Sequence, residues 1–191
     1  MKNGLKTHVM ALDTSMSTLK SYTYIIAFSI LTAIGSWIVL PLPFTPVPIT
    51  LQTFFVLLSG ALLGHKRGAV SQLVYLGYGL IGLPVYSAGQ GGAWVLFGPT
   101  GGYLLAFPVA AYLTGLMTSR DRNFYVNLGG LFIGSIPILL LGTLQLKILS
   151  GSTFQEALTL GFFPFFAGDF LKSCFGAMVL TAKHKFFSKD K

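Results

Sequence analysis

Charged residues are scarce in this chain. Of its 191 residues, 9% are Asp, Glu, Lys or Arg, while 53% are hydrophobic. Soluble domains carry about 25% charged residues, so this chain has too few to cover a globular fold in water. Cysteine is almost absent too: Cys174 is the only one, which excludes a disulfide within the chain. With a mean hydropathy of +0.72, the composition indicates an integral membrane protein.

Long apolar runs account for most of the sequence. A helix needs about 20 mostly apolar residues to cross a bilayer, and six segments approach this length. We expect an all-α protein whose six transmembrane helices cover residues 22–40, 49–64, 68–83, 99–117, 126–149 and 162–181. The membrane domain is therefore predicted over residues 22–181, between a cytoplasmic N-terminal segment, 1–21, and a basic cytoplasmic tail, 182–191.

The basic residues predict the orientation of these helices. With the N-terminus in the cytoplasm, eleven of the thirteen Lys and Arg residues fall on the inner side. Inner loops of membrane proteins carry such an excess, so we expect both termini to be cytoplasmic. The net charge of +8 is then an orientation signal. It does not indicate nucleic-acid binding, because no basic stripe with interleaved aromatic residues is present.

The outer connections differ in composition from the inner ones. Residues 41–48 contain four prolines, which impose an extended path. Residues 82–93 and 98–103 are rich in glycine, a residue that lets the backbone approach a ligand or another helix closely. These loops are unlike simple tethers.

Familiar catalytic and metal-binding patterns are missing. The string Gly77-Tyr-Gly79-Leu-Ile-Gly82 lies inside a predicted helix, where small residues favour helix packing rather than dinucleotide binding. No P-loop and no G-x-S-x-G motif occurs, and the three histidines have no metal-ligand partner at i+3 or i+4. We interpret Cys174 as a packing residue. The sequence therefore predicts no catalytic residues, no metal site and no enzyme.

Asp169 and Lys172 are the exception to the apolar pattern. They lie within the last predicted span, three residues apart, so they share one helix face and can pair. Ionisable residues within a membrane are costly and usually functional. The alternative is a structural ion pair that fixes helix packing. Because the pair lies on the same side as the proline and glycine loops, we favour a ligand pocket open to the exterior.

Three motifs together resemble the BioY family, the biotin-binding S components of energy-coupling factor (ECF) transporters. They are Pro46-Val-Pro-Ile-Thr-Leu-Gln52, then Gly82-Leu-Pro-Val-Tyr-Ser-Ala-Gly-Gln-Gly-Gly92 with Gly98-Pro-Thr-Gly-Gly-Tyr103, and Gly168-Asp169-Phe-Leu-Lys172. The resemblance covers residues 22–181. It implies a six-helix S-component fold in a prokaryotic cell membrane, no cofactor, and capture of biotin from outside. It also implies three protein partners, a membrane coupling subunit and two ATP-binding subunits.

The chemistry of biotin suggests which residues contact the ligand. Asp169 and Lys172 would serve the polar groups of biotin, and backbone N–H groups around Gly91, Gly92 and Ala93 would contact its other end. Trp94, Phe97 and Tyr103 are candidates either for packing on the apolar part or for contact with lipid. The substrate-binding candidates are Asp169, Lys172, Gly91, Gly92, Ala93, Thr50, Gln52, Tyr75 and Tyr103. S components commonly present Ala-x-x-x-Ala to the coupling subunit; the nearest match here is Ser29-x-x-x-Ala33, which we take as the expected docking pair.

The residues alone leave other functions open. A membrane-embedded enzyme would need more than one acid and one base. An ion-coupled carrier or channel would usually show polar positions along several helices, whereas here they gather at one end. A stand-alone solute carrier, or an S component for a different vitamin, stays an alternative.

Overall fold

The structure is a computed structural model that describes residues 2–118 and 123–187. Side chains are described from residue 18 to residue 182, with the same internal gap. Arg120, Arg122 and the end of the basic tail, which contribute to the predicted orientation, lie outside the described residues.

Helices make up most of the described chain, and one small hairpin interrupts them. The hairpin pairs β1 (Val39–Leu40) with β2 (Ile49–Thr50) in antiparallel register. The helices are α1 (Lys2–Trp37), α2 (Gln52–Leu63), α3 (His65–Leu80), α4 (Gly101–Thr118), α5 (Phe124–Ser150), α6 (Phe154–Gly161) and α7 (Phe163–Phe187), with short 3-10 turns η1 (Ser87–Gly89) and η2 (Ala93–Phe97). The all-α prediction is confirmed.

Each of the six expected segments contains a helix, but the spans expected at 22–40 and 49–64 also include β1 and β2, and the helices differ in length. Among the described residues, three stretches are long and apolar enough to cross a membrane: α4, α5 and the continuous stretch Phe154–Ala182. With 12 and 16 residues, α2 and α3 are shorter than the roughly 20 residues of a full span. Residues 2–21 form the first part of α1, which runs on without a break to Trp37. No change in backbone structure therefore separates the predicted N-terminal segment from the first expected span.

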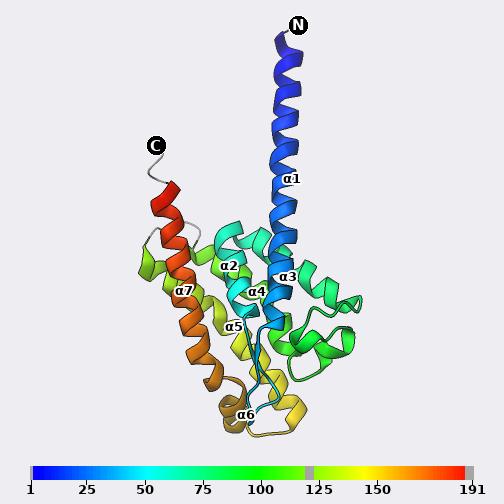
Figure 1. Cartoon of the computed structure of the whole chain (residues 1–191), viewed down its shortest axis with the longest axis vertical. Coiled ribbons are helices and arrows are strands. Elements are labelled where there is room, and N and C mark those ends of the chain that lie inside the picture. Colours follow the sequence, from blue (N-terminus) through cyan, green and yellow to red (C-terminus); the bar gives the residue numbers. More distant parts are fainter. Residues whose placement is uncertain (1, 119–122, 188–191) are drawn as a thin grey trace.

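The two ends of the bundle differ. Figure 1 places the start of α1 and the end of α7 at one end, and α6 at the opposite end. The predicted connection at 150–161 contains α6, whose first turn is closed by a capping box: Thr153 accepts from the Glu156 N–H, and the Glu156 carboxylate accepts from the Thr153 N–H.

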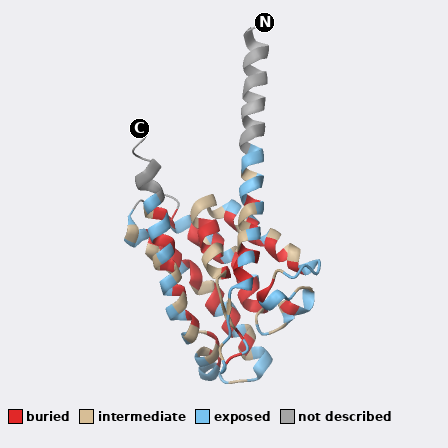
Figure 2. Cartoon of the chain, viewed as in Figure 1, coloured by how far each residue is buried: buried red, intermediate tan, exposed pale blue. Residues whose placement is uncertain are grey.

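Close helix packing depends on glycine at a few positions. The most extensive helix contact joins α4 and α5, where a Cβ on Gly142 would overlap the Tyr103 ring. In the G-x-G-x-x-G string, Gly79 packs against the Tyr86 ring with no room for a side chain. Of the three glycines in the string, Gly79 serves packing as predicted, whereas Gly77 and Gly82 have open space beside them. Figure 2 shows the buried residues on the faces that the helices turn toward one another.

The outward faces of the bundle are apolar. Exposed fractions reach 72% at Ile148 and 60% at Leu171. A soluble monomer rarely leaves large apolar patches in water. The surface is consistent with a protein solvated by lipid, and the chain is a multi-pass membrane protein.

The expected docking pair, Ser29 and Ala33, lies on α1. Both lie on the inner face of α1: Ser29 is fully buried and donates to the Ile26 carbonyl, and Ala33 belongs to the hydrophobic core. The exposed face of α1 carries Ile30 and Ile34 instead. Small residues at this spacing allow α1 to approach α2 and α3, and a role of this pair in docking stays a prediction.

Candidate functional site

A cavity of about 520 Å³ lies between the hairpin, α2, α4, α5 and α7. This volume includes space that is open to solvent. The lining residues are Val47, Pro48, Thr50, Gln52, Thr53, Ser87, Thr100, Tyr103, Leu104, Phe107, Ile138, Leu139, Phe165, Asp169 and Lys172. They come from segments more than 120 positions apart in the sequence.

The proline loop reaches the cavity because the hairpin folds it back. Val39 pairs with Thr50, and the Leu51 N–H donates to the carbonyls of Gly35 and Ile38. The chain therefore returns to the end of α1 before α2 begins. This return brings Thr50 and Gln52 to the cavity wall.

One wall of the cavity is apolar and aromatic. The rings of Tyr103 and Phe165 lie against each other, with centroids 5.9 Å apart, and Phe107, Leu104 and Ile138 continue this surface. The Tyr103 hydroxyl donates to the Gly161 carbonyl at 2.7 Å. Tyr103 therefore offers the cavity its ring, while its hydroxyl ties α4 to the end of α6.

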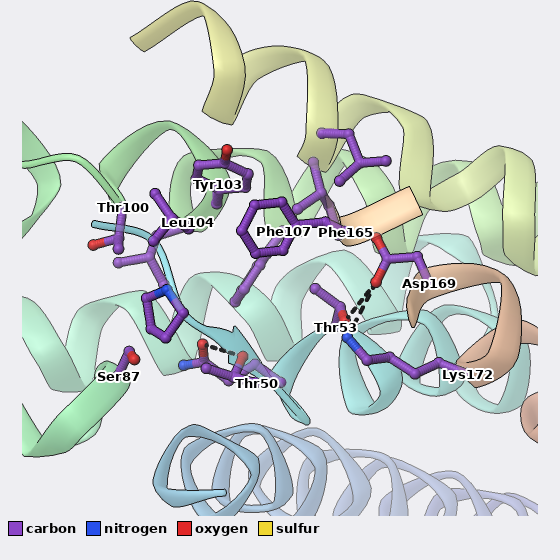
Figure 3. A pocket seen from close by; sticks show the side chains of 15 residues that line it. Thr50, Thr53, Ser87, Thr100, Tyr103, Leu104, Phe107, Phe165, Asp169 and Lys172 are labelled. Carbon is purple, nitrogen blue, oxygen red and sulfur yellow. Dashed lines mark hydrogen bonds and ion pairs between the residues drawn. The ribbon is translucent and has the colours of Figure 1, made fainter. Parts of the chain in front are cut away.

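Asp169, Lys172 and Thr53 form a closed triangle of polar contacts at one side of the cavity (Figure 3). Lys172 Nζ lies 3.1 Å from Asp169 Oδ1 and donates to Thr53 Oγ1 at 2.7 Å, and Thr53 Oγ1 donates to Asp169 Oδ1 at 3.2 Å. Asp169 is 2% exposed and the Lys172 side chain 15%. Charge-assisted hydrogen bonds of this kind compensate for removing both charges from water.

Two buried oxygens on the cavity wall are left without hydrogen bonds among the described residues. They are Asp169 Oδ2 and Ser87 Oγ. An unsatisfied buried polar atom costs about 1–3 kcal/mol, so such atoms usually serve a ligand or an ordered water. The cavity therefore offers a carboxylate acceptor on α7 and a hydroxyl on the glycine-rich loop.

The predicted site residues divide into two groups. Asp169, Lys172, Thr50, Gln52 and Tyr103 line the cavity. Tyr75 is fully buried but lies behind Gln52, to which it is hydrogen-bonded.

The predicted glycine-loop contacts are not part of the cavity wall as the structure describes it. Gly91, Gly92 and Ala93 are absent from the lining. The Gly92 N–H donates to the Gly79 carbonyl at 2.7 Å, so it is engaged within the fold. Trp94 and Phe97 are 63% and 78% exposed, away from the cavity.

Several lining residues have no signal in the sequence. Thr53 is hydrogen-bonded to Asp169, which lies 116 positions away in the sequence. No local sequence pattern predicts this contact. Ser87 and Thr100 lie in the glycine-rich segments, whose composition drew attention to backbone rather than hydroxyl groups. Phe107 and Phe165 resemble ordinary core aromatics. Within residues 2–118 and 123–187, no cluster of three His, Cys, Asp or Glu side chains could hold a metal ion.

Comparison with known proteins gives a consistent result. The model of the BioY family matches residues 7–189. The chain is 39% identical over 152 residues to a biotin transporter BioY from Thermotoga maritima, covering 80% of this chain and 88% of that protein. It is 37% identical over 160 residues to a probable biotin transporter BioY from Pyrococcus horikoshii, covering 84% and 93%.

A solved structure shares the fold. The crystal structure of the S component for biotin from an ECF-type ABC transporter superposes with a TM-score of 0.79 at 31% sequence identity, covering 88% of this chain and 93% of that one. The family match extends over nearly the whole chain and includes the segments that build the cavity. This chain therefore belongs to the BioY family.

Proposed function

We propose that this chain is the biotin-binding S component of an ECF-type transporter in a prokaryotic cell membrane. Its relatives include proteins described as biotin transporters, and a solved relative is an S component for biotin. The observation that carries the proposal is Asp169, a buried carboxylate with one unpaired oxygen on the wall of a largely apolar cavity. Such a protein binds and releases its ligand unchanged and is not an enzyme.

The cavity offers groups that complement the chemistry of biotin. Biotin has two ureido N–H donors and a ureido carbonyl, an apolar ring and chain, and a carboxylate. Asp169 Oδ2 would accept from a ureido N–H, and Lys172 would donate to the ureido oxygen or the carboxylate, with charge-assisted bonds that are strong at low local dielectric. The aromatic wall around Phe107 and Phe165 would cover the apolar part.

Energy for transport would come from partner proteins. The sequence contains no P-loop, so we propose that a membrane coupling subunit and two ATP-binding subunits drive inward release. Ser29 and Ala33, the expected docking pair, are buried in the chain on its own, whereas Ile30 and Ile34 on the same helix are exposed and could meet the coupling subunit. With both termini inside, the cavity would take biotin from the extracytoplasmic side.

Purified protein tests the ligand directly. Mass spectrometry of protein extracted in mild detergent should detect bound biotin, and calorimetric titration of ligand-free protein should show saturable binding. Thiamine and riboflavin serve as comparison vitamins. Saturable binding of one of these, with none of biotin, would assign the chain to another substrate. Solute flux into vesicles that hold this chain alone would favour a stand-alone carrier.

A further inference from the structure

We infer that Tyr75 is a positioning residue whose hydroxyl fixes the direction of the Gln52 amide at the ligand cavity. The inference rests on the proposed function, because it concerns the same cavity. Tyr75 lies on α3, is fully buried and does not line the cavity, whereas Gln52 does. The two side chains are hydrogen-bonded to each other, so Tyr75 acts on the cavity through Gln52.

The direction of the hydrogen bonds follows from one backbone carbonyl. The Val85 oxygen lies 3.0 Å from the Tyr75 hydroxyl, and a carbonyl oxygen can only accept. The phenol has a single hydrogen, which it donates to Val85. Toward Gln52 the phenol oxygen can then only accept, so Gln52 must present its Nε2 amine to Tyr75.

The other end of the amide agrees with this direction. Gln52 Oε1 accepts from Thr50 Oγ1 at 3.1 Å. The amide then keeps one N–H and one lone pair free for a ligand. If the amide were reversed, its oxygen would face the phenol oxygen while the phenol donates to Val85. Gln52 is only 3% exposed, so water could not compensate for that mismatch.

The same hydroxyl joins two segments that border the cavity. Gln52 begins α2 directly after the proline loop, and Val85 lies two residues before the lining residue Ser87. Tyr75 therefore sets the donor and acceptor pattern of the cavity floor from behind. The affinity of a ligand with a matching arrangement of N–H and C=O groups would therefore depend on Tyr75, although the ligand does not contact Tyr75.

Tyr86 provides a matched control. It is also fully buried, its hydroxyl also donates to a backbone carbonyl, that of Leu76 at 2.8 Å, and its ring packs against Tyr75 at 5.8 Å. No hydrogen bond of the Tyr86 hydroxyl to a cavity side chain is present in the described structure. A purely structural role for Tyr75 predicts that Tyr75→Phe and Tyr86→Phe behave alike.

The experiment is a double-mutant cycle on biotin affinity, measured by calorimetric titration beside a melting curve. Tyr75→Phe should weaken biotin binding by about threefold to tenfold, the loss expected for one misplaced hydrogen bond. Tyr86→Phe should bind as the wild type does, even where it melts lower. In the Gln52→Ala background, Tyr75→Phe should cause no further loss, because coupled residues are not additive.

Three outcomes would overturn the inference: equal affinities for Tyr75→Phe and Tyr86→Phe, additive losses in the cycle, or wild-type affinity in Gln52→Ala. Wild-type affinity in Gln52→Ala would overturn the inference even if Tyr75→Phe fails to fold, because Tyr75 could then not act on biotin through Gln52. A wild-type protein that does not bind biotin would refute the proposed function. A wild type that binds while the cycle fails would refute the role of Tyr75 alone.

Discussion

At the scale of single residues, the triangle of Asp169, Lys172 and Thr53 buries two charges in the wall of the cavity. Asp169→Asn keeps the shape of the side chain but leaves Lys172 without a compensating charge. Lys172→Met keeps much of the length and leaves Asp169 unpaired. Each change should weaken biotin binding by about 1.5–3 kcal/mol, the range for hydrogen bonds to charged groups, which is roughly tenfold to more than a hundredfold. Calorimetric titration of the detergent-solubilised variants measures the loss.

A structural ion pair would give a different result from a ligand site. Loss of packing lowers the melting temperature and the yield, while the protein that survives keeps its affinity for biotin. Melting curves of the two variants therefore belong beside the titrations. Near-native affinity in both folded variants would remove Asp169 and Lys172 from the site.

Thr53 should contribute less, because it acts on the charged pair rather than carrying charge. Thr53→Val removes the hydroxyl that donates to Asp169 Oδ1 and accepts from Lys172. We expect biotin affinity to fall by about threefold to tenfold. Thr114→Val is the control, since Thr114 is fully buried on α4, does not line the cavity, and its Oγ1 has no hydrogen bond among the described residues. If both variants bind equally well, Thr53 is not part of the site.

Some residues of the site can be predicted from the sequence and others cannot, for a physical reason. Asp169 and Lys172 are recognisable because a charge within an apolar run demands an explanation. Thr53 and Ser87 are ordinary in their local context, and only the fold brings them to the cavity. The glycine loop illustrates the opposite case. Its composition is unusual, but the Gly92 N–H already donates to the Gly79 carbonyl within the fold.

At the scale of elements, the helices are more predictable than their ends and faces. Apolar length identified all six segments, because a backbone in lipid must satisfy its own hydrogen bonds. The same criterion could not detect α6, which has eight residues and is defined by its capping box. Nor could it tell the inner face of α1 from the outer one, since a helix in lipid is apolar on both.

That difference between faces makes a prediction for α1. Ala33 is 9% exposed and packs within the core, whereas Ile30 on the same helix is 47% exposed. Ala33→Leu should destabilise the protein by about 1–3 kcal/mol through overpacking, and Ile30→Leu should leave stability unchanged. Thermal melting in detergent measures both. Equal melting temperatures would mean that Ala33 faces outward in the folded protein.

At the scale of the whole molecule, the orientation in the membrane links the cavity to its proposed use. The start of α1 and the end of α7 point toward the same end of the bundle (Figure 1), and Lys66 and Arg67 lie in the first turn of α3, after Gly64. The positive-inside rule places such clusters in the cytoplasm. The cavity, bordered by the hairpin and the start of α7, would then face outward.

Cysteine labelling tests this orientation in intact cells. In a Cys174→Ser background, an impermeant maleimide should label Gln90→Cys and Gln155→Cys from outside, since both positions are exposed near η1 and in α6. Lys66→Cys, exposed at the start of α3, should react only after the cells are opened. All three positions are exposed, so a difference in labelling between them in sealed cells reports the side of the membrane. Labelling after lysis shows that each cysteine can react with the reagent. Labelling of Lys66→Cys in sealed cells would reverse the topology, and the cavity would open to the cytoplasm. Capture of biotin from outside would then be untenable, even if the purified protein bound biotin tightly.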